Sequence, residues 1–432
     1  MAGELHDPAT RRFLFLQGPH GPFFASLAGR LKGAGAEVSR IGFNRGDAFF
    51  WRRLAGFHGY HGRADDWGGW LRQHVEKHQI TDIVCYGASR PNHAVARDIA
   101  QESNLTVHAF EEGYLRPYWI TYERGGTNAS SPLVDLSLDE MRAGLENASA
   151  PLRAAPDRWG DMRQHVFWGA AYHALLISGR RKFPAFRSHR QPGPEAEFAL
   201  YLKHLVAMPT RRIRRRISTW RIRRGSFPYH VALLQLAHDA NFRDNSDFDS
   251  QSEFLSMVFR AFAAGAPKHH HLVIKTHPLE DGREPLLPLL HSLANAHGLA
   301  DRMHLLTGGK LAKLLDDAES AVTVNSTAAE QVLWRGLPLK AFGRAVYNRP
   351  EFVSDQSLTD FFAAPKPPDL SEYQDYRRFL LQTSQIPGGF YSYQGRRRLL
   401  RRLPDLMLAR TGPYHTLLTT RAATTQHLRV VP

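Results

Sequence analysis

His-Leu-Val-Ile-Lys-Thr-His-Pro, residues 271–278, joins a short apolar run to a polar end. Leu272 to Ile274 has the length and the β-branched content of a buried strand, which the final proline stops. Lys275, Thr276 and His277 therefore leave the predicted strand together. Because ligands of open α/β sheets bind at the carboxyl edge of the strands, this stretch predicts a site for an anionic ligand. A strand end that carries solvated polar residues is the alternative interpretation.

Strand-like and helix-like segments alternate on both sides of this stretch. The predicted strands cover 13–16, 38–43, 82–86 and 106–110 in the first half of the chain, and 230–236, 272–274, 303–306, 321–324 and 338–342 in the second. Helical patterns separate them, which is the βαβ rhythm of parallel, doubly wound sheets. We therefore expect an α/β protein with two Rossmann-like domains facing a cleft, as in GT-B glycosyltransferases and related nucleotide-sugar enzymes.

Changes in sequence character predict four segments. They are an N-terminal Rossmann-like domain on the acceptor side over 1–150, a basic helical connection over 151–225, a Rossmann-like nucleotide-sugar domain over 226–346, and a C-terminal helical tail over 347–432 that braces both domains. A chain of 432 residues is too long for a single core, so more than one domain is expected.

The composition is that of a large globular protein, with 43% hydrophobic residues and a net charge of +15. This charge favours anionic partners such as nucleic acid, lipid headgroups or nucleotide phosphates, without choosing among them. The single cysteine, Cys85, excludes an intrachain disulfide and disfavours a cysteine-built metal site. Phe13 to Leu16 is too short for a signal-peptide core, and no run approaches the roughly 20 apolar residues of a membrane span. We expect a cytoplasmic protein whose membrane association is peripheral.

The most basic segment lies between residues 211 and 224, where arginines surround a few apolar residues. Ile213, Ile217 and Trp220 share one helical face, which suits a helix lying on an anionic membrane surface. A nucleic-acid groove is a second interpretation, but the segment lacks the interleaved stacking aromatics of single-strand binders. A solvated helix that packs on the domain through its isoleucines is a third. We expect an anionic membrane partner and no nucleic acid.

Carboxylates stand at two other predicted strand ends. Glu111 and Glu112 end a strand of the first domain, and only one should face the cleft because neighbours on a strand point to opposite faces. Asp239 leaves the first strand of the second domain. Two carboxylates that flank a sugar are what retaining glycosyl transfer requires, one as nucleophile and one as acid/base. Arg116 can pair with a neighbouring glutamate or with a substrate carboxylate.

Asn325-Ser326-Thr327 precedes a predicted helix over 328–335. Ser326 or Thr327 can cap this helix, and the free amides at its start can bind a phosphate. Ordinary capping explains the same residues. The phosphate interpretation is favoured because Lys275 leaves another strand of the same domain at the same expected edge.

Short motifs from Phe13 to about Tyr391 carry a family resemblance. They are Leu16 to Pro19, Phe43 to Asp47, Arg90 to His93, Phe110 to Thr121, Leu234 to Leu236, Lys275 to Pro278, Val324 to Thr327 and Gly388 to Tyr391. Together they resemble the capsule polysaccharide biosynthesis and export family of KpsS/LipB-like proteins. The sequence departs from that family's pattern at Lys275-Thr276, where a second histidine often stands, and at Ala237-His238.

The resemblance implies a retaining β-Kdo transferase that adds 3-deoxy-manno-octulosonate (Kdo) from CMP-Kdo to a lysophosphatidylglycerol anchor at the cytoplasmic face of the inner membrane. Glu111 or Glu112 becomes the acid/base and Asp239 the nucleophile. The residues implied for the nucleotide sugar are Gln235, Lys275, His277, Pro278, Asn325, Ser326 and Thr327, and those for the other substrate are Gln17, Arg90, His93 and Arg116. No metal or other cofactor is expected, since cations and amides can stabilise the leaving phosphate.

The implied partners are a CMP-sugar donor, a lipid acceptor, the inner-membrane surface and other capsule assembly proteins. A non-catalytic capsule export or assembly factor is the alternative function. A sugar-nucleotide epimerase shares the expected architecture and would act without an acceptor.

Overall fold

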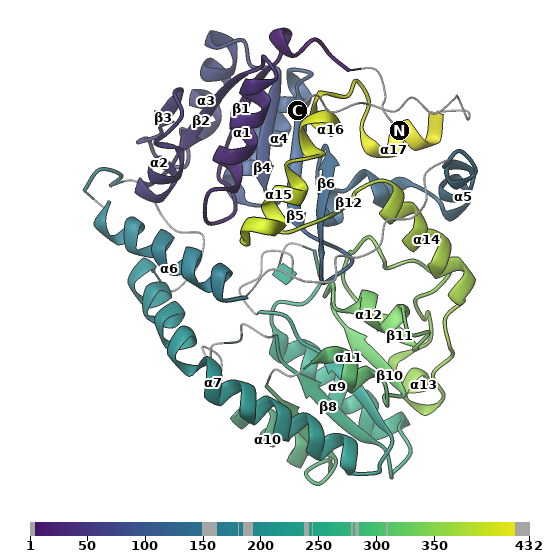
Figure 1. Cartoon of the computed structure of the whole chain (residues 1–432). Helices are drawn as coiled ribbons and strands as arrows, with labels where there is room; N and C mark the ends of the chain where they lie inside the picture. The colour runs from purple at the N-terminus through teal and green to yellow at the C-terminus, as the bar shows by residue number, and fades with distance from the viewer. Residues whose placement is uncertain are drawn as a thin grey trace. The chain divides into compact units, whose positions relative to one another are not determined.

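The computed structural model describes residues 5–148, 162–179, 181–184, 193–236, 242–243, 245–277, 280, 285–307 and 310–419. The chain forms two compact units (Figure 1): unit 1 comprises Met1–Leu205 and Tyr376–Pro432, and unit 2 comprises Val206–Asp375. These limits differ from the predicted segments. The expected C-terminal tail is divided between the units at residues 375 and 376, and the basic connection is divided at residues 205 and 206.

Unit 1 is built on a seven-stranded sheet with the order β12-β6-β5-β4-β1-β2-β3. Its strands are β1 (Arg12–Phe15), β2 (Glu37–Gly42), β3 (Phe57–Gly59), β4 (Asp82–Tyr86), β5 (Thr106–Glu112), β6 (Trp119–Arg124) and β12 (Gln385–Pro387). Its helices are α1 (Phe23–Gly33), α2 (Arg45–Trp51), α3 (Trp67–Lys77), α4 (Pro91–Glu102), α5 (Leu138–Glu146), α6 (Met162–Ser178), α15 (Tyr393–Leu399), α16 (Leu403–Leu408) and α17 (Pro413–Thr419). Five neighbouring strands pair in parallel, as the βαβ rhythm predicts. In sheet order they are β3, β2, β1, β4 and β5.

The sheet of unit 1 is buried on both faces, and β1 shows why. Phe13 and Phe15 pack in a cluster with residues of α1, α15 and α16, whereas Leu14 and Leu16 pack in a second cluster with residues of α3 and α4. Because successive side chains of a strand point to opposite faces, a strand covered on both sides has to be apolar throughout. The continuous run Phe-Leu-Phe-Leu is therefore the sequence signature of this doubly covered position.

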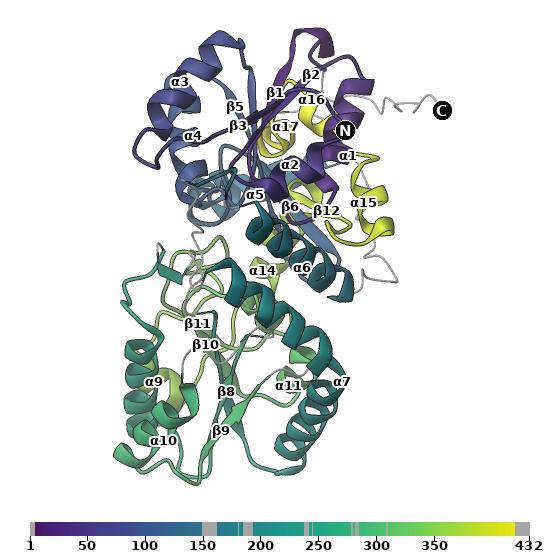
Figure 2. The same ribbon diagram turned by 90° about the vertical axis from the view of Figure 1, so that its left-hand side faces the viewer.

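Unit 2 has a five-stranded, fully parallel sheet with the order β11-β10-β7-β8-β9. Its strands are β7 (Tyr229–Leu233), β8 (His271–Lys275), β9 (Met303–Leu306), β10 (Ser320–Thr323) and β11 (Leu339–Ala341). Its helices are α9 (Gln251–Gly265), α10 (Leu286–Ala296), α11 (Leu311–Leu315), α12 (Ala329–Leu333) and α13 (Leu358–Ala363). Figure 2 shows α9 and α10 on one side of this sheet and α11 on the other. A core cluster joins the sheet to α9, α10 and α13.

Two helices contain the boundary between the units. They are α7 (Pro194–Arg224) and α14 (Leu370–Gln382). α7 holds the basic segment that the sequence analysis singled out, within one helix of 31 residues. Among the described helices, none combines the length and the hydropathy that crossing a bilayer requires.

The structure differs from the predicted all-parallel first sheet at one side. β6 pairs with β5 in the antiparallel sense, and β12 pairs with β6 in the same sense. β12 lies more than 250 residues after β6 in the chain, so no local pattern announces their pairing. The short elements α2 and β3 were also not predicted.

Candidate active site

Glu111 and Glu112 are the last two residues of β5 and point to opposite faces of the unit 1 sheet. Phe110 belongs to the core cluster on the α1 side, and Ala109 belongs to the cluster on the α3 and α4 side. The alternation along the strand therefore places Glu112 on the α1 side and Glu111 on the α4 side. Each glutamate has its own surroundings, which decides their separate chemistry.

Glu111 lies beside the loop that follows β4. A side chain at Gly87 would come within 3.1 Å of Arg90 Nε and 3.6 Å of Glu111 Oε2, and Gly87 has φ +77°. Both the space and the backbone conformation therefore favour glycine at this position. Burial raises the pKa of Glu111 to about 7, and the positive charge of Arg90 opposes this rise. A carboxyl group with a pKa near 7 can accept or donate a proton at physiological pH, which is the requirement for a general acid/base.

Glu112 is held by two phenols instead. The Tyr86 hydroxyl donates to Glu112 Oε1 at 3.4 Å. Burial raises the pKa of Glu112, and the charge of Arg116 and hydrogen bonds from Tyr391 and Tyr86 oppose the rise. Arg116 itself is exposed and donates through Nε to Gly113 O at 3.1 Å.

Arg90 and Gln17 meet at the carboxyl edge of the unit 1 sheet. Arg90 donates to Gln17 Oε1 at 3.2 Å and lies over the Tyr86 ring at 5.0 Å. Gln17 Nε2 donates to the hydroxyl of Tyr172, on α6, at 2.7 Å. The structure thus brings together the predicted residues Gln17, Arg90 and Glu111. It adds Tyr172, which the sequence analysis did not single out.

A buried ion pair supports this edge from behind. Arg40, on β2, donates to Asp47 Oδ1 at 2.8 Å, and both side chains are buried. The Phe43 amide and Asn44 Nδ2 donate to the other carboxylate oxygen at 3.1 and 2.9 Å. Asn44 Nδ2 also donates to the Tyr172 hydroxyl at 2.8 Å, which joins the ion pair to the edge. The motif Phe43 to Asp47 was recognisable in the sequence, but its function as a buried anchor was not.

His93 has a different position from the predicted one. It is 1% exposed, and its Nδ1 lies 2.9 Å from Gly87 O. Burial lowers the pKa of His93 to about 3, so the imidazole is neutral. A side chain without accessible surface is not placed to bind a substrate directly. The structure therefore assigns His93 to supporting the Gly87 loop.

In unit 2, Gln235 and Asn325 bind each other. Gln235 Nε2 donates to Asn325 Oδ1 at 2.7 Å, and the main-chain amide of Asn325 donates back to Gln235 Oε1 at 3.1 Å. Asn325 Nδ2 donates to Asn245 O at 3.2 Å. The two predicted ligands of the nucleotide sugar thus connect the ends of β7 and β10, so their polar groups hold the loops in position.

Lys275 and Thr276 occupy the end of β8 between these loops and β9. The Lys275 ammonium is buried and donates to Thr276 O at 2.9 Å. Thr276 Oγ1 is buried and has no hydrogen-bond partner among the described residues. A buried hydroxyl without a partner costs about 1–3 kcal/mol, and a ligand that hydrogen-bonds to it recovers that cost. His277 follows and is half-buried.

The loop after β10 is arranged differently from its prediction. The helix that follows, α12, has only five residues, and its N-cap is Ala328 without a side-chain cap. Ser326 Oγ accepts from the Ala328 amide at 3.2 Å, and Ser326 O accepts from Tyr347. A helix of this length offers little dipole, because few peptide units are aligned. Phosphate binding here therefore gains little from a helix dipole and would depend on the loop itself, which includes the half-buried Thr327. Asp239 and Pro278 lie outside the described residues.

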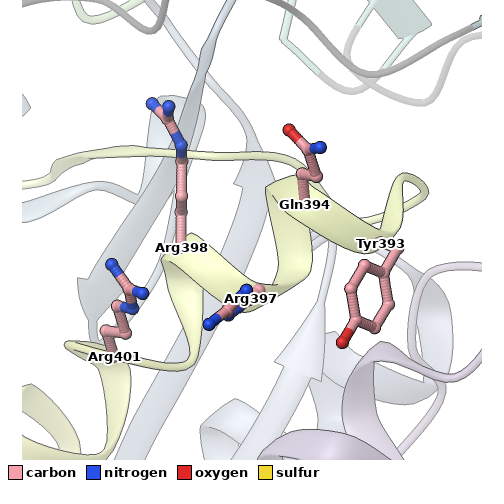
Figure 3. Close-up of a pocket in the computed structure, with 5 residues that line it drawn as sticks. All are labelled: Tyr393, Gln394, Arg397, Arg398 and Arg401. Atoms are coloured by element: carbon pink, nitrogen blue, oxygen red, sulfur yellow. The ribbon is translucent and has the colours of Figure 1, made fainter.

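A hollow of about 320 Å³ lies along α15 in unit 1. It is lined by Tyr393, Gln394, Arg397, Arg398 and Arg401, which Figure 3 shows spread along the helix and the turn after it. Three guanidinium groups without a carboxylate among the lining residues favour an anion.

Comparison with known proteins decides the family. Residues 81–391 match the family model described as capsule polysaccharide biosynthesis protein. The chain is 31% identical over 386 residues to the capsule polysaccharide export protein KpsS of Escherichia coli, covering 88% of this chain and 97% of the relative. The chain belongs to the capsule polysaccharide biosynthesis protein family.

A second relative and one solved structure are also similar to this chain. The capsule polysaccharide modification protein LipB of Neisseria meningitidis serogroup B is 31% identical over 394 residues, covering 89% of this chain and 92% of the relative. A Thermosulfurimonas dismutans KpsC structure, named a β-Kdo 2,7 transferase, is 13% identical with a TM-score of 0.44, over 92% of this chain and 100% of that one. The family model includes Glu111, Lys275 and Thr276, whereas Gln17 and Asp47 lie before its first matched residue.

Proposed function

We propose that this member of the capsule family is a retaining glycosyltransferase that moves Kdo from CMP-Kdo to a lysophosphatidylglycerol acceptor. The observation that carries the proposal is Glu111, a carboxyl group at a strand end whose pKa burial raises to about 7 beside Arg90. Family membership supplies the capsule context. Titratable groups with pKa values near the working pH are concentrated at catalytic sites.

The proposed chemistry has two displacements at the anomeric carbon of Kdo. In the first, a carboxylate that we assign to Asp239 attacks this carbon, and CMP leaves with the electron pair of the broken carbon–oxygen bond. In the second, the acceptor hydroxyl oxygen attacks the same carbon and the Asp239 carboxylate leaves. Glu111 takes the proton of the hydroxyl in this step. Configuration is retained because each displacement inverts it once.

The CMP phosphate is assigned to the end of β8. Lys275 supplies a positive charge and Thr276 supplies a hydroxyl that has no partner among the described residues. Cations and preorganised donors stabilise the charge that a leaving phosphate develops, so the proposal includes no metal in this step.

A transfer assay tests the function directly. The full chain is incubated with CMP-Kdo and lysophosphatidylglycerol, and the lipid product and released CMP are measured by mass spectrometry and chromatography. Equal amounts of Kdo-lipid and CMP, with retention at the anomeric carbon shown by NMR, are expected. CMP-Kdo binding without either product would contradict transfer and favour an assembly factor.

Replacing Thr276 with valine should weaken CMP binding about tenfold, since the loss of one hydrogen bond to a phosphate costs about 1.4 kcal/mol. Stability should stay the same or rise, because the hydroxyl has no hydrogen-bond partner among the residues that the structure describes. Calorimetric titration with CMP and urea unfolding measure both effects. Thr323→Val is the matched control, since the Thr323 hydroxyl donates to Leu233 O at 2.9 Å. The Thr323→Val variant should lose stability and keep its CMP affinity. If Thr323→Val lost CMP affinity and Thr276→Val kept it, Thr276 would be excluded from the site.

A lipid acceptor lies in a membrane, so the protein needs a surface that binds membranes. Helix α7 provides a candidate for this surface. Within unit 2, the exposed large apolar residues among the described side chains of α7 are Val206, Ile213, Ile217 and Trp220, with exposed fractions between 44 and 75%. At 100° per residue they fall within an arc of about 60°, which is a continuous apolar stripe. Ile222 is buried instead, at 6% exposure. The isoleucines at 213 and 217 therefore do not serve as the packing face that the third interpretation required, and we propose that the stripe inserts into the interface of an anionic membrane.

The double variant Ile213→Asn, Ile217→Asn should bind phosphatidylglycerol vesicles at least tenfold more weakly in a flotation assay. Wild-type binding should also decrease with ionic strength and be weak on neutral vesicles, because the surrounding arginines contribute through charge. Leu287→Asn is the control, since Leu287 is 48% exposed on α10 of the same unit. Equal losses in the two variants would show that α7 has no special part in vesicle binding.

The exposed stripe is also the observation that favours the second candidate, a non-catalytic export or assembly factor. Such a protein needs the surface and not the raised pKa of Glu111. Vesicle binding together with an inactive transfer assay would select this alternative.

A further inference from the structure

The side chains of three histidines in unit 1 lie close together, at a distance from β5, the strand that carries Glu111 and Glu112. His58 is the middle residue of the edge strand β3, His74 lies in α3, and His78 is the residue directly after α3. One ring nitrogen from each lies within 4.8 Å of the other two. The spacing of four residues between His74 and His78 places both on the same helical face, opposite the strand.

One buried ring nitrogen of this cluster has no partner among the described residues. His74 is only 7% exposed, and its Nε2 is buried without a hydrogen-bond partner among the described residues. A buried polar nitrogen left unpaired is costly, so its persistence needs a reason. Stacking of Trp70 on His74, with ring centroids 5.0 Å apart, explains the packing of the ring but leaves the nitrogen unsatisfied.

The histidines of unit 2 behave differently. His230 is bonded through Nδ1 to Ser320 and through Nε2 to His270, at 2.7 and 2.9 Å. His271 and His304 bond to each other at 2.8 Å. These histidines of unit 2 are therefore hydrogen-bonded to one another, whereas His74 Nε2 in unit 1 has no such bond among the described residues.

We propose that His58, His74 and His78 bind a divalent transition-metal ion of the Zn²⁺ class. Three neutral imidazoles suit Zn²⁺, Co²⁺, Ni²⁺ or Cu²⁺ and leave a fourth position for water. Zn–N bonds of about 2.0–2.1 Å in tetrahedral geometry place the nitrogens about 3.3 Å apart. The half-buried His58 and His78 rings move toward the buried His74 to reach this spacing.

Imidazole ligates a metal ion in its neutral form, which is the prevailing form of an ordinary histidine at pH 7. In the sheet, β3 is four strands from β5, so the site is separate from Glu111 and serves the edge of the sheet. A metal here connects the three-residue strand β3 to α3 and stabilises an edge that few backbone hydrogen bonds hold.

The test uses the full chain without a histidine tag. After incubation with ZnCl₂ and dialysis, mass spectrometry of metals should find one Zn²⁺ per wild-type chain, and Tm should rise with Zn²⁺. Co²⁺ should give the visible absorption of a tetrahedral site. His78→Gln, at the half-buried position, and His74→Gln should each lower Zn²⁺ affinity at least tenfold and remove the Tm rise.

His61→Gln is the matched control, since His61 is exposed, lies three residues from His58 and stacks on Phe183. It should bind Zn²⁺ as the wild type does. Zn²⁺ stoichiometry that is unchanged in folded His78→Gln, or a wild-type chain that retains no Zn²⁺ after dialysis, would overturn the proposal. Neither outcome depends on transferase activity.

Discussion

Glu111→Gln is expected to lower kcat/KM for Kdo transfer by a factor of about 10² to 10⁴, the usual contribution of a general acid/base. Glutamine keeps the shape of the side chain and removes the proton transfer. Because Glu111 acts as a base in the second displacement, the wild-type rate should rise with pH through about 7 and then level off. This limb should be absent from the residual activity of the variant. Initial rates across pH 5.5–8.5 (roughly the range in which burial-shifted carboxyls titrate) measure both effects.

The same substitution should stabilise the protein. The pKa of Glu111 is raised from 4.5 to about 7 in the folded state, so the folded chain binds more protons than the unfolded chain between these values. The free energy of unfolding therefore falls as the pH rises through this window, by about 3 kcal/mol at most. Glutamine does not ionise and avoids this loss. Tm of the variant should exceed that of the wild type above pH 7, and the two should converge toward pH 4.5.

Glu112→Gln is the matched control at the neighbouring position. It faces the other side of the sheet, where Tyr86 donates to it, and should change kcat/KM much less. A larger loss in Glu112→Gln than in Glu111→Gln would transfer the acid/base role to Glu112. Full activity in both variants would remove the proposed chemistry.

Asp47→Ala is expected to have the largest effect on stability, a loss of about 3–5 kcal/mol. It leaves the buried Arg40 guanidinium without its carboxylate, removes the acceptor of the Phe43 amide and removes one of the two acceptors of Asn44 Nδ2. Arg40 is only 4% exposed, so water cannot replace the lost partner. Urea unfolding monitored by Trp fluorescence measures the difference, and Asp47→Asn offers a milder variant should Asp47→Ala not fold.

Two further variants test the buried ion pair and its connection to the sheet edge separately. The double variant Arg40→Met, Asp47→Leu should recover much of the stability, since it removes both buried charges together. Tyr172→Phe should cost about 1 kcal/mol and still lower activity, because the hydroxyl connects the ion pair to Gln17 and thereby to Arg90. A loss in Asp47→Ala no greater than in Asp65→Ala, an exposed position, would contradict the anchor role.

Much of the fold was predictable because burial leaves a local periodic pattern. The run Phe13 to Leu16 is apolar at every position since both faces of β1 are covered, and the strand over 303–306 occurs as predicted. The family motifs and the strand-end position of Glu111 were likewise visible. Each of these features depends only on residues close together in the chain.

Other features depend on residues that are distant in the chain. The pairing of β12 with β6 joins segments more than 250 residues apart, and Glu111 meets Gly87 and Arg90 from the loop after β4 only in the folded sheet. The same holds for His58, which meets His74 and His78 only after β3 takes its place at the sheet edge. Likewise, Ser326 or Thr327 was predicted to cap the following helix, whereas the N-cap of α12 is Ala328.

The sequence by itself determined the two α/β sheets, the family and which side chains stand at strand ends. Tertiary structure alone decided which glutamate is next to Arg90, which carboxylate anchors the edge and which histidines share a site. The physical reason is that side-chain periodicity is written within one strand or helix. Charge pairing and desolvation are set instead by neighbours that only folding brings within a few ångströms.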